Sequence, residues 1–270
     1  MNIAESETLL QFYENIDVFL IVFIRAMGFF LLLPIMSGQN IPVMARVGLC
    51  LGVALLAFTS NAVILPDYTM TLIGFGFFMM QEFVIGILMG FIVMMFFSMF
   101  HFVGQLVDFQ MGFSMVSVHD PFGRTQTPIT GNFYNLIASM FFVFTGALHS
   151  VIRVFFESFH ITPIGQGSIL GNPTIPYTIT MIIIQYFLFG LRIAMPVVGT
   201  LIVVDIVLGI LVKAVPQMNI FVVGIPLKVF IGLIIIFLTL PLLRDAFAFV
   251  MSDIIGYLLN ILRGMMINVG

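Results

Sequence analysis

Residues 83–102 read FVIGILMGFIVMMFFSMFHF, a run of 20 residues without an acidic side chain, a lysine or an arginine. The hydrocarbon core of a bilayer is about 30 Å thick, and about 20 apolar residues of helix are needed to cross it. The run therefore predicts a membrane-spanning helix. Apolar runs of comparable or greater length recur along the chain, at 16–35, 41–65, 68–102, 133–156, 175–215 and 218–240. We expect an all-α, polytopic membrane protein.

Glycine and proline interrupt the longer runs. Segments 68–102 and 175–215 both exceed what one crossing needs, and Gly86 with Gly90 would let a neighbouring helix approach closely. Pro196 lacks the N–H that an α-helix uses, so we expect it to kink or split its helix. Residues 247–262 mix apolar and polar side chains, which is typical of an amphipathic end helix. The sequence therefore predicts bent, Gly/Pro-interrupted helices.

The composition of the chain agrees with a membrane protein. Of its 270 residues, 61% are hydrophobic and only 8% are charged, whereas about a quarter of the residues of soluble domains are charged. A soluble enzyme is therefore excluded. The 9 basic and 12 acidic residues leave a net charge of −3, so no surface for binding nucleic acid is expected.

Glycine and proline are also dense in two connectors, at 104–131 and 160–176. Because such residues end helices, the second connector predicts a boundary between residues 1–172 and residues 173–270. Further along, Pro216 cannot continue a helix and Asn219 can cap the next one through its side chain. We expect two antiparallel helical arms, 179–215 and 220–240, that turn at Pro216, Gln217, Met218 and Asn219.

Four charged residues lie inside apolar runs: Arg25, Glu82, Arg192 and Asp205. Ionisable groups within a membrane usually pair with one another, and none of these four has an evident partner one helical turn away. We interpret them as members of ion pairs between helices or as polar contacts between subunits.

No pattern in the sequence predicts catalysis or metal binding. The four histidines do not have the spacing of metal ligands. Motifs of nucleophilic and nucleotide-binding enzymes do not occur in the sequence. We therefore expect neither a cofactor nor an enzymatic activity.

The first connector contains an apolar segment in which Met and Phe occur beside small residues and an Asp-Pro turn. Methionine is flexible and adapts to irregular surfaces. The segment is either a connector packed on lipid or on a partner, or a deformable seal around something variable. Its residues of interest are Gly112, Phe113, Ser114, Met115, Val116, Val118, Asp120 and Pro121.

Two motifs carry a resemblance to a known family. Residues 104–113 read GQLVDFQMGF and are followed by Asp120-Pro121, and residues 214–228 read AVPQMNIFVVGIPLK. Together with the earlier Gln81-Glu82 pair, they occur in the order found in the FliR family, which supplies a subunit of the flagellar type III protein export gate. The sequence resembles that family over nearly its whole length.

The resemblance implies an assembly as well as a fold. FliR-like subunits join FliP-like and FliQ-like subunits in a helical hetero-oligomer, which passes unfolded flagellar proteins across the bacterial inner membrane at the flagellar basal body. Other export apparatus membrane proteins and lipid are the further partners implied.

The resemblance also divides the chain into parts. Residues 1–172 correspond to a FliP-like part, with a plug loop at about 110–128 that closes the pore. Residues 173–270 correspond to a FliQ-like helical hairpin plus the amphipathic end helix. The second motif places Gly224, Pro226 and Lys228 with the residues of the hairpin turn.

Two alternatives stay open. The injectisome has a homologous gate subunit, which sequence separates poorly from the flagellar one. A small-molecule or ion secondary transporter often has two similar halves with interrupted helices. Segments 68–102 and 175–215 are both interrupted, but their polar patterns differ and no internal repeat is evident.

Overall fold

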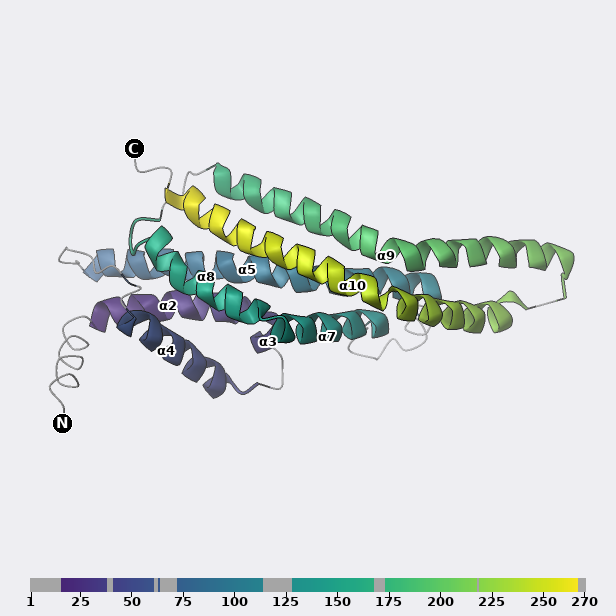
Figure 1. The fold of residues 1–270 in the computed structure, drawn as a ribbon, viewed down its shortest axis with the longest axis horizontal. Helices are drawn as coiled ribbons and strands as arrows, with labels where there is room; N and C mark the ends of the chain where they lie inside the picture. The colour runs from purple at the N-terminus through teal and green to yellow at the C-terminus, as the bar shows by residue number, and fades with distance from the viewer. Residues whose placement is uncertain are drawn as a thin grey trace. The chain divides into compact units, whose positions relative to one another are not determined.

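The computed structural model describes residues 16–37, 41–60, 63, 72–113, 128–167, 173–217 and 219–266 (Figure 1). These residues form helices and contain no strand, so the all-α prediction is confirmed. The helices are α2 (Ile16–Leu32), α3 (Pro34–Ser37), α4 (Val43–Thr59), α5 (Leu72–Met111), α7 (Ile129–Phe144), α8 (Ala147–Ile161), α9 (Thr174–Ala214) and α10 (Ile220–Met266).

Three of the described helices, α5, α9 and α10, are long and apolar enough to cross a membrane, with mean hydropathies of 2.5, 2.5 and 2.7. Helices α7 and α8 form a fourth candidate span, which is bent by 66°. Gly146 lies in that break with a φ of 75°, a left-handed conformation that glycine adopts without steric cost. The run expected at 133–156 is therefore two helices.

The predicted end of the apolar run at 68–102 is wrong, because helix α5 continues through residues 104–111. The sequence assigned these residues to a connector on account of their glycine and polar side chains. Val103, Val107 and Met111 nevertheless keep the spacing of one helical face and are fully buried. Two of the polar residues between them, Asp108 and Gln110, have partners on other helices.

The expected end helix at 247–262 is also wrong as a separate element, because it is the last part of α10. Its buried side chains follow one helical face: Phe247, Val250, Ile254, Leu258 and Ile261. Pro226 and Pro241 lie inside α10 and Pro196 lies inside α9 without ending either helix. Figure 1 shows that the axes of both helices change direction partway along.

The chain forms two compact units that alternate along the sequence. The first draws on Met1–Met94, Leu148–Ile182 and Asp253–Gly270, and the second on Met95–Ala147 and Ile183–Ser252. Helices α5, α9 and α10 each contribute to both units. This is a division in space, and the division of the chain after residue 172 stays a prediction.

In the first unit, α2 packs closely on the first half of α5 at the two glycines that the sequence singled out. A Cβ atom at Gly86 would collide with the backbone of Arg25 and Phe29, and one at Gly90 would collide with the Phe29 carbonyl. The missing side chains therefore allow the two helix backbones to touch.

In the second unit, phenylalanine rings from three helices form the core. Phe247 of α10 lies 5.2 Å from Phe96 of α5 and 5.4 Å from Phe141 of α7, measured between ring centroids. Phe97 of α5 and Phe142 of α7 meet edge to face at 5.3 Å. Edge-to-face rings add to the stabilisation that burial of their area supplies.

Candidate functional site

The end of α5 is joined to the start of α7 through Asp108. The backbone N–H of Thr130 donates to both carboxylate oxygens, at 3.1 Å each. The first N–H groups of a helix have no partner within the helix, and Pro128 supplies no side-chain cap to α7. A nearly buried carboxylate from α5 therefore caps α7 and faces the positive end of its dipole.

The same two helices meet at a pair of glycines. A Cβ atom on Gly104 would collide with the backbone of Gly131. Gly104 and Asp108 are four residues apart and so lie on one face of α5. Together they anchor the two ends of the segment between α5 and α7 to one another.

A glycine turns the chain out of α5. Gly112 has a φ of 89°, and its N–H donates to the Phe109 carbonyl at 3.2 Å. The N–H of Phe113 donates to the Asp108 carbonyl at 3.1 Å. These two bonds are those of a Schellman motif, which satisfies the last carbonyls of a helix and favours glycine at the left-handed position.

A polar contact joins the last turn of α5 to α9 and α10. Gln110 Nε2 donates to Asp205 Oδ2 at 2.8 Å, and Lys228 Nζ lies 3.0 Å from that oxygen and 2.8 Å from Oδ1. The carboxylate of Asp205 thus holds three helices together. We call Gln110, Asp205 and Lys228 the polar clasp. A pocket beside it is lined by Met111, Gly112, Asp205, Leu208, Phe221, Gly224, Ile225 and Lys228.

Helices α9 and α10 form a hairpin in the second unit. Asp205 pairs with Lys228, and Phe189 stacks on Phe249 at 5.2 Å between centroids, so residue numbers rise on one helix as they fall on the other. The helices are antiparallel.

The turn of this hairpin lies where the sequence placed it. Helix α9 ends at Ala214 and α10 begins at Ile220. Asn219 caps α10, because its Oδ1 accepts the N–H of Phe221 at 3.1 Å. Gly224, Pro226 and Lys228 lie beyond the turn, within α10.

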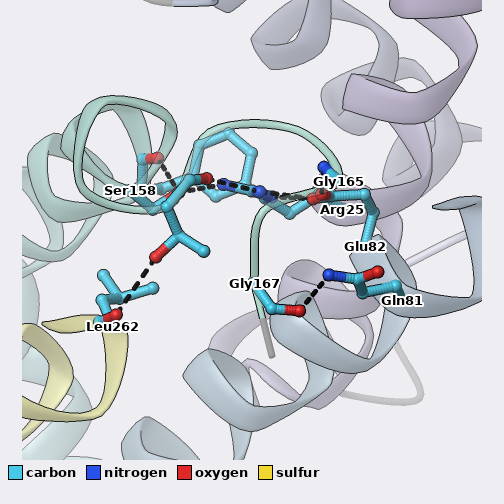
Figure 2. Close-up of polar contacts among 9 residues, drawn as sticks. Arg25, Gln81, Glu82, Ser158, Gly165, Gly167 and Leu262 are labelled. Atoms are coloured by element: carbon cyan, nitrogen blue, oxygen red, sulfur yellow. Dashed lines mark hydrogen bonds and ion pairs between the residues drawn. The ribbon is translucent and has the colours of Figure 1, made fainter. Parts of the chain in front are cut away.

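A second polar cluster lies in the first unit (Figure 2). Arg25 of α2 is fully buried and forms an ion pair with Glu82 of α5. The guanidinium also donates to Ser158 Oγ at 3.0 Å and to the Thr162 carbonyl at 2.9 Å. It lies over the ring of Phe159, 4.2 Å from the centroid.

This Arg25 cluster fastens the chain that follows α8. The N–H of Gly165 donates to Glu82 Oε1 at 3.3 Å, and Gln81 Nε2 donates to the Gly167 carbonyl. Figure 2 shows Glu82 and Gln81 reaching this stretch from one helix. Each guanidinium nitrogen and both Glu82 oxygens have a partner. Such complete pairing is what a buried charge pair in a structural role needs.

The family of the chain follows from comparison with known proteins. Residues 16–254 match the model of a family described as bacterial export proteins, family 1. This chain belongs to that family. It is 31% identical to flagellar biosynthetic protein FliR of Bacillus subtilis over 81% of this chain and 84% of the relative. It is 28% identical to surface presentation of antigens protein SpaR of Shigella flexneri over 84% of this chain and 88% of the relative.

The chain is also 30% identical to flagellar biosynthetic protein FliR of Aquifex aeolicus, over 85% of this chain and 88% of the relative. The resemblance to the FliR family is therefore confirmed. Bacterial export proteins of this family are structural membrane proteins of an export apparatus and not enzymes. With its long apolar helices, this family member is a multi-pass protein of the bacterial inner membrane. Within the described ranges, no group of His, Cys, Asp and Glu could hold a metal ion.

The structure brings three of the four charged residues into ion pairs within the chain, Arg25 with Glu82 and Asp205 with Lys228. Arg192 is exposed on α9. Gly112 and Phe113 follow α5 directly. The other predicted residues of the plug and one of the turn lie outside the described residues: Ser114, Met115, Val116, Val118, Asp120, Pro121 and Met218.

Sequence reasoning assigned no contact to Asp108 or Gln110, although both lie in the GQLVDFQMGF motif. Their partners, Thr130 and Asp205, are 22 and 95 residues away. The one available signal was a lone carboxylate after a long apolar run, close to a connector rich in glycine and proline. Such a carboxylate is well placed to cap the helix that follows the connector.

Proposed function

We propose that this chain is a channel-forming structural subunit of the flagellar type III protein export gate, through which unfolded flagellar proteins cross the inner membrane. The observation that carries the proposal is the match to FliR proteins over more than four fifths of the chain and of those relatives. Its partners would be FliP-like and FliQ-like subunits in a helical hetero-oligomer, with other export apparatus membrane proteins beside them.

The distribution of charge along the hairpin supports contact with other subunits. Asp205 follows Arg192 by 13 residues on α9, and Arg244 follows Lys228 by 16 residues on α10. At 1.5 Å per residue these stretches are about 20 Å and about 24 Å long, shorter than the hydrocarbon core of about 30 Å. A bilayer centred on either stretch would place charged side chains inside its hydrocarbon core, whereas neighbouring protein subunits can pair with these side chains.

The apolar surface of the hairpin also supports an assembly. Ile206 and Ile210 of α9 are 58% and 63% exposed, and Phe230 and Phe237 of α10 are 65% and 73% exposed. Large exposed apolar surfaces mark sites of contact with protein or membrane. In this proposal, residues 173–270 are the FliQ-like part and residues 1–172 the FliP-like part.

The segment that begins at Gly112 is the proposed plug of the closed pore. Its two ends are anchored to each other by Asp108 with Thr130 and by Gly104 with Gly131. A Met- and Phe-rich loop held at both ends can seal through many weak, deformable contacts.

Deleting Ser114–Val118 tests the plug. The gate would be purified with its partner subunits, reconstituted in vesicles, and assayed for leakage of ions and small solutes. The proposal expects higher leakage with assembly preserved. Unchanged permeability in a fully assembled deletion variant would contradict it. The matched control is Gly52→Ala on α4, outside the hairpin, because a Cβ atom there meets nothing within 4 Å.

The match to SpaR proteins supports an injectisome gate subunit as the second candidate. The two systems are separated by complementation. A flagellar subunit should restore motility and flagellin export to a strain that lacks its own FliR, and it should not restore secretion by an injectisome that lacks its SpaR-like subunit. The opposite result would favour the second candidate.

A further inference from the structure

Arg192 differs from the other three charged residues of the apolar runs. It is exposed on α9, and no ion pair or hydrogen bond of its side chain occurs in the described part of the chain. A charged group in apolar surroundings is costly unless it is paired. Within the described residues, Arg192 therefore lacks the counter-charge that such a site needs.

Arg192 lies at a groove between α9 and α10. Helix α9 lines the groove with Phe189, Arg192, Ile193 and Pro196, and α10 lines it with Thr239, Leu242, Leu243 and Ala246. Both sets follow the spacing of one helical face. The groove is thus bounded by two antiparallel helices and is apolar apart from Thr239 and the single cation.

Pro196 adds a second polar feature at the same place. It has no N–H to donate to the Arg192 carbonyl, which lies four residues earlier in α9. One residue of this groove therefore offers both a cation and a backbone carbonyl that lacks its usual helical donor.

We propose that this groove is the docking site of an apolar helix from a neighbouring gate subunit, and that an Asp or Glu on that helix pairs with Arg192. The proposal rests on the proposed function, which supplies the neighbouring subunits. A helix fits because side-chain ridges of one helix pack into grooves of others. A carboxylate fits because guanidinium groups bind it through two parallel hydrogen bonds.

A phospholipid is the rival occupant, with its phosphate on Arg192 and an acyl chain in the groove. The charge spacing of the hairpin argues against it. If Arg192 marked one headgroup level, Asp205, 13 residues along α9, and its partner Lys228 would lie only about 20 Å away toward the turn, inside a hydrocarbon core of about 30 Å. In the other direction, Asp253 of α10 would lie inside the core, because it is only 7 residues beyond Ala246 of the groove. If protein subunits surround the hairpin instead, these charged side chains do not lie in hydrocarbon.

The test uses the full chain co-expressed with the other membrane proteins of its gate, purified through a tag on this chain and weighed by native mass spectrometry. Arg192→Glu should lower the assembled fraction by about tenfold or more, because two like charges then meet where an ion pair forms. Arg192→Lys should keep most of the assembly. The matched control is Arg153→Glu, since Arg153 is an exposed cation of α8 that lies outside the hairpin and does not line the groove.

A charge-swap experiment identifies the partner. Each Asp and Glu in the apolar helices of the partner subunits is changed to Arg in the presence of Arg192→Glu, and one of these changes should restore assembly. Normal assembly of the Arg192→Glu chain, or no rescue by any swap, would overturn the proposal. So would phospholipid that accompanies the wild-type gate and is lost from Arg192→Gln without a change in assembly. If the proposed function itself is wrong, the wild-type chain will not co-purify with these subunits at all.

Discussion

The carboxylate of Asp108, at the end of α5, accepts the backbone N–H of Thr130 in the first turn of α7 at 3.1 Å. One helix thus caps the other across a segment of the chain whose sequence begins in the GQLVDFQMGF motif. Because Asp108 is nearly buried, water cannot readily replace its carboxylate if the side chain is removed.

Asp108→Ala should therefore loosen the start of α7. Loss of a helix cap costs about 0.5–2 kcal/mol, and a buried N–H left without an acceptor costs about 1–3 kcal/mol. We expect a lower melting temperature and faster proteolysis between residues 113 and 128 in the purified protein. Asp108→Asn should have a melting temperature between those of the wild type and Asp108→Ala, because its amide oxygen can still accept the hydrogen bond. Asp245→Ala, at an exposed site on α10, is the control, and equal behaviour of Asp108→Ala and Asp245→Ala would contradict the capping role.

Glu82→Ala should be among the most destabilising single changes in the first unit. It leaves the fully buried guanidinium of Arg25 without its counter-charge, and breaking one side of a buried pair typically costs about 3–5 kcal/mol. The double replacement Arg25→Met with Glu82→Leu should recover much of that loss, because no charge is then left buried. Thermal unfolding in detergent measures both, with Glu157→Ala on the exposed side of α8 as the control. A double variant less stable than Glu82→Ala would contradict this account.

The sequence predicted correctly those features that depend on residues close together in the chain. The hairpin turn was found because Pro216 cannot continue α9 and Asn219 supplies a cap within two residues of the N–H it binds. The close approach of α2 and α5 was signalled by Gly86 and Gly90, whose spacing places both on one helical face.

Contacts between residues far apart in the sequence could not be predicted in this way. Arg25 and Glu82 are 57 residues apart, so a search one helical turn away could not join them. For the same reason the end of α5 was assigned to a connector. Asp108 and Gln110 resemble loop residues until Thr130 and Asp205 are known to be their partners.

Two alanine substitutions on α5 separate close packing from helix propensity. Gly86→Ala places a Cβ atom against the backbone of Arg25 and Phe29 on α2, which cannot move aside as a flexible side chain can. Overpacking of this kind costs about 1–3 kcal/mol. Gly76→Ala meets nothing within 4 Å and should instead gain up to about 1 kcal/mol from the higher helix propensity of alanine. Melting temperatures that shift in the same direction for both variants would count against the contact.

The polar clasp should contribute a small, salt-dependent coupling between Asp205 and Lys228. The side chain of Asp205 is 43% exposed and that of Lys228 is 17% exposed, and partly exposed ion pairs are worth about 0.2–1 kcal/mol. In a double-mutant cycle, Asp205→Asn and Lys228→Met should each lower the melting temperature slightly. The double variant should lose less than the sum of the two, and the difference should shrink at high ionic strength, where exposed charges are screened.

A second cycle separates the amide of the clasp from its ion pair. Gln110→Leu removes the bond from α5 to Asp205 Oδ2 and leaves Lys228 in place. Because Gln110 is neutral, its coupling to Asp205 should persist at high salt while that of Lys228 falls. Strict additivity of the single effects would mean that the three side chains meet in the structure without acting as a unit. Equal salt dependence of both couplings would mean that Gln110 and Lys228 do not act on the carboxylate in these two separate ways.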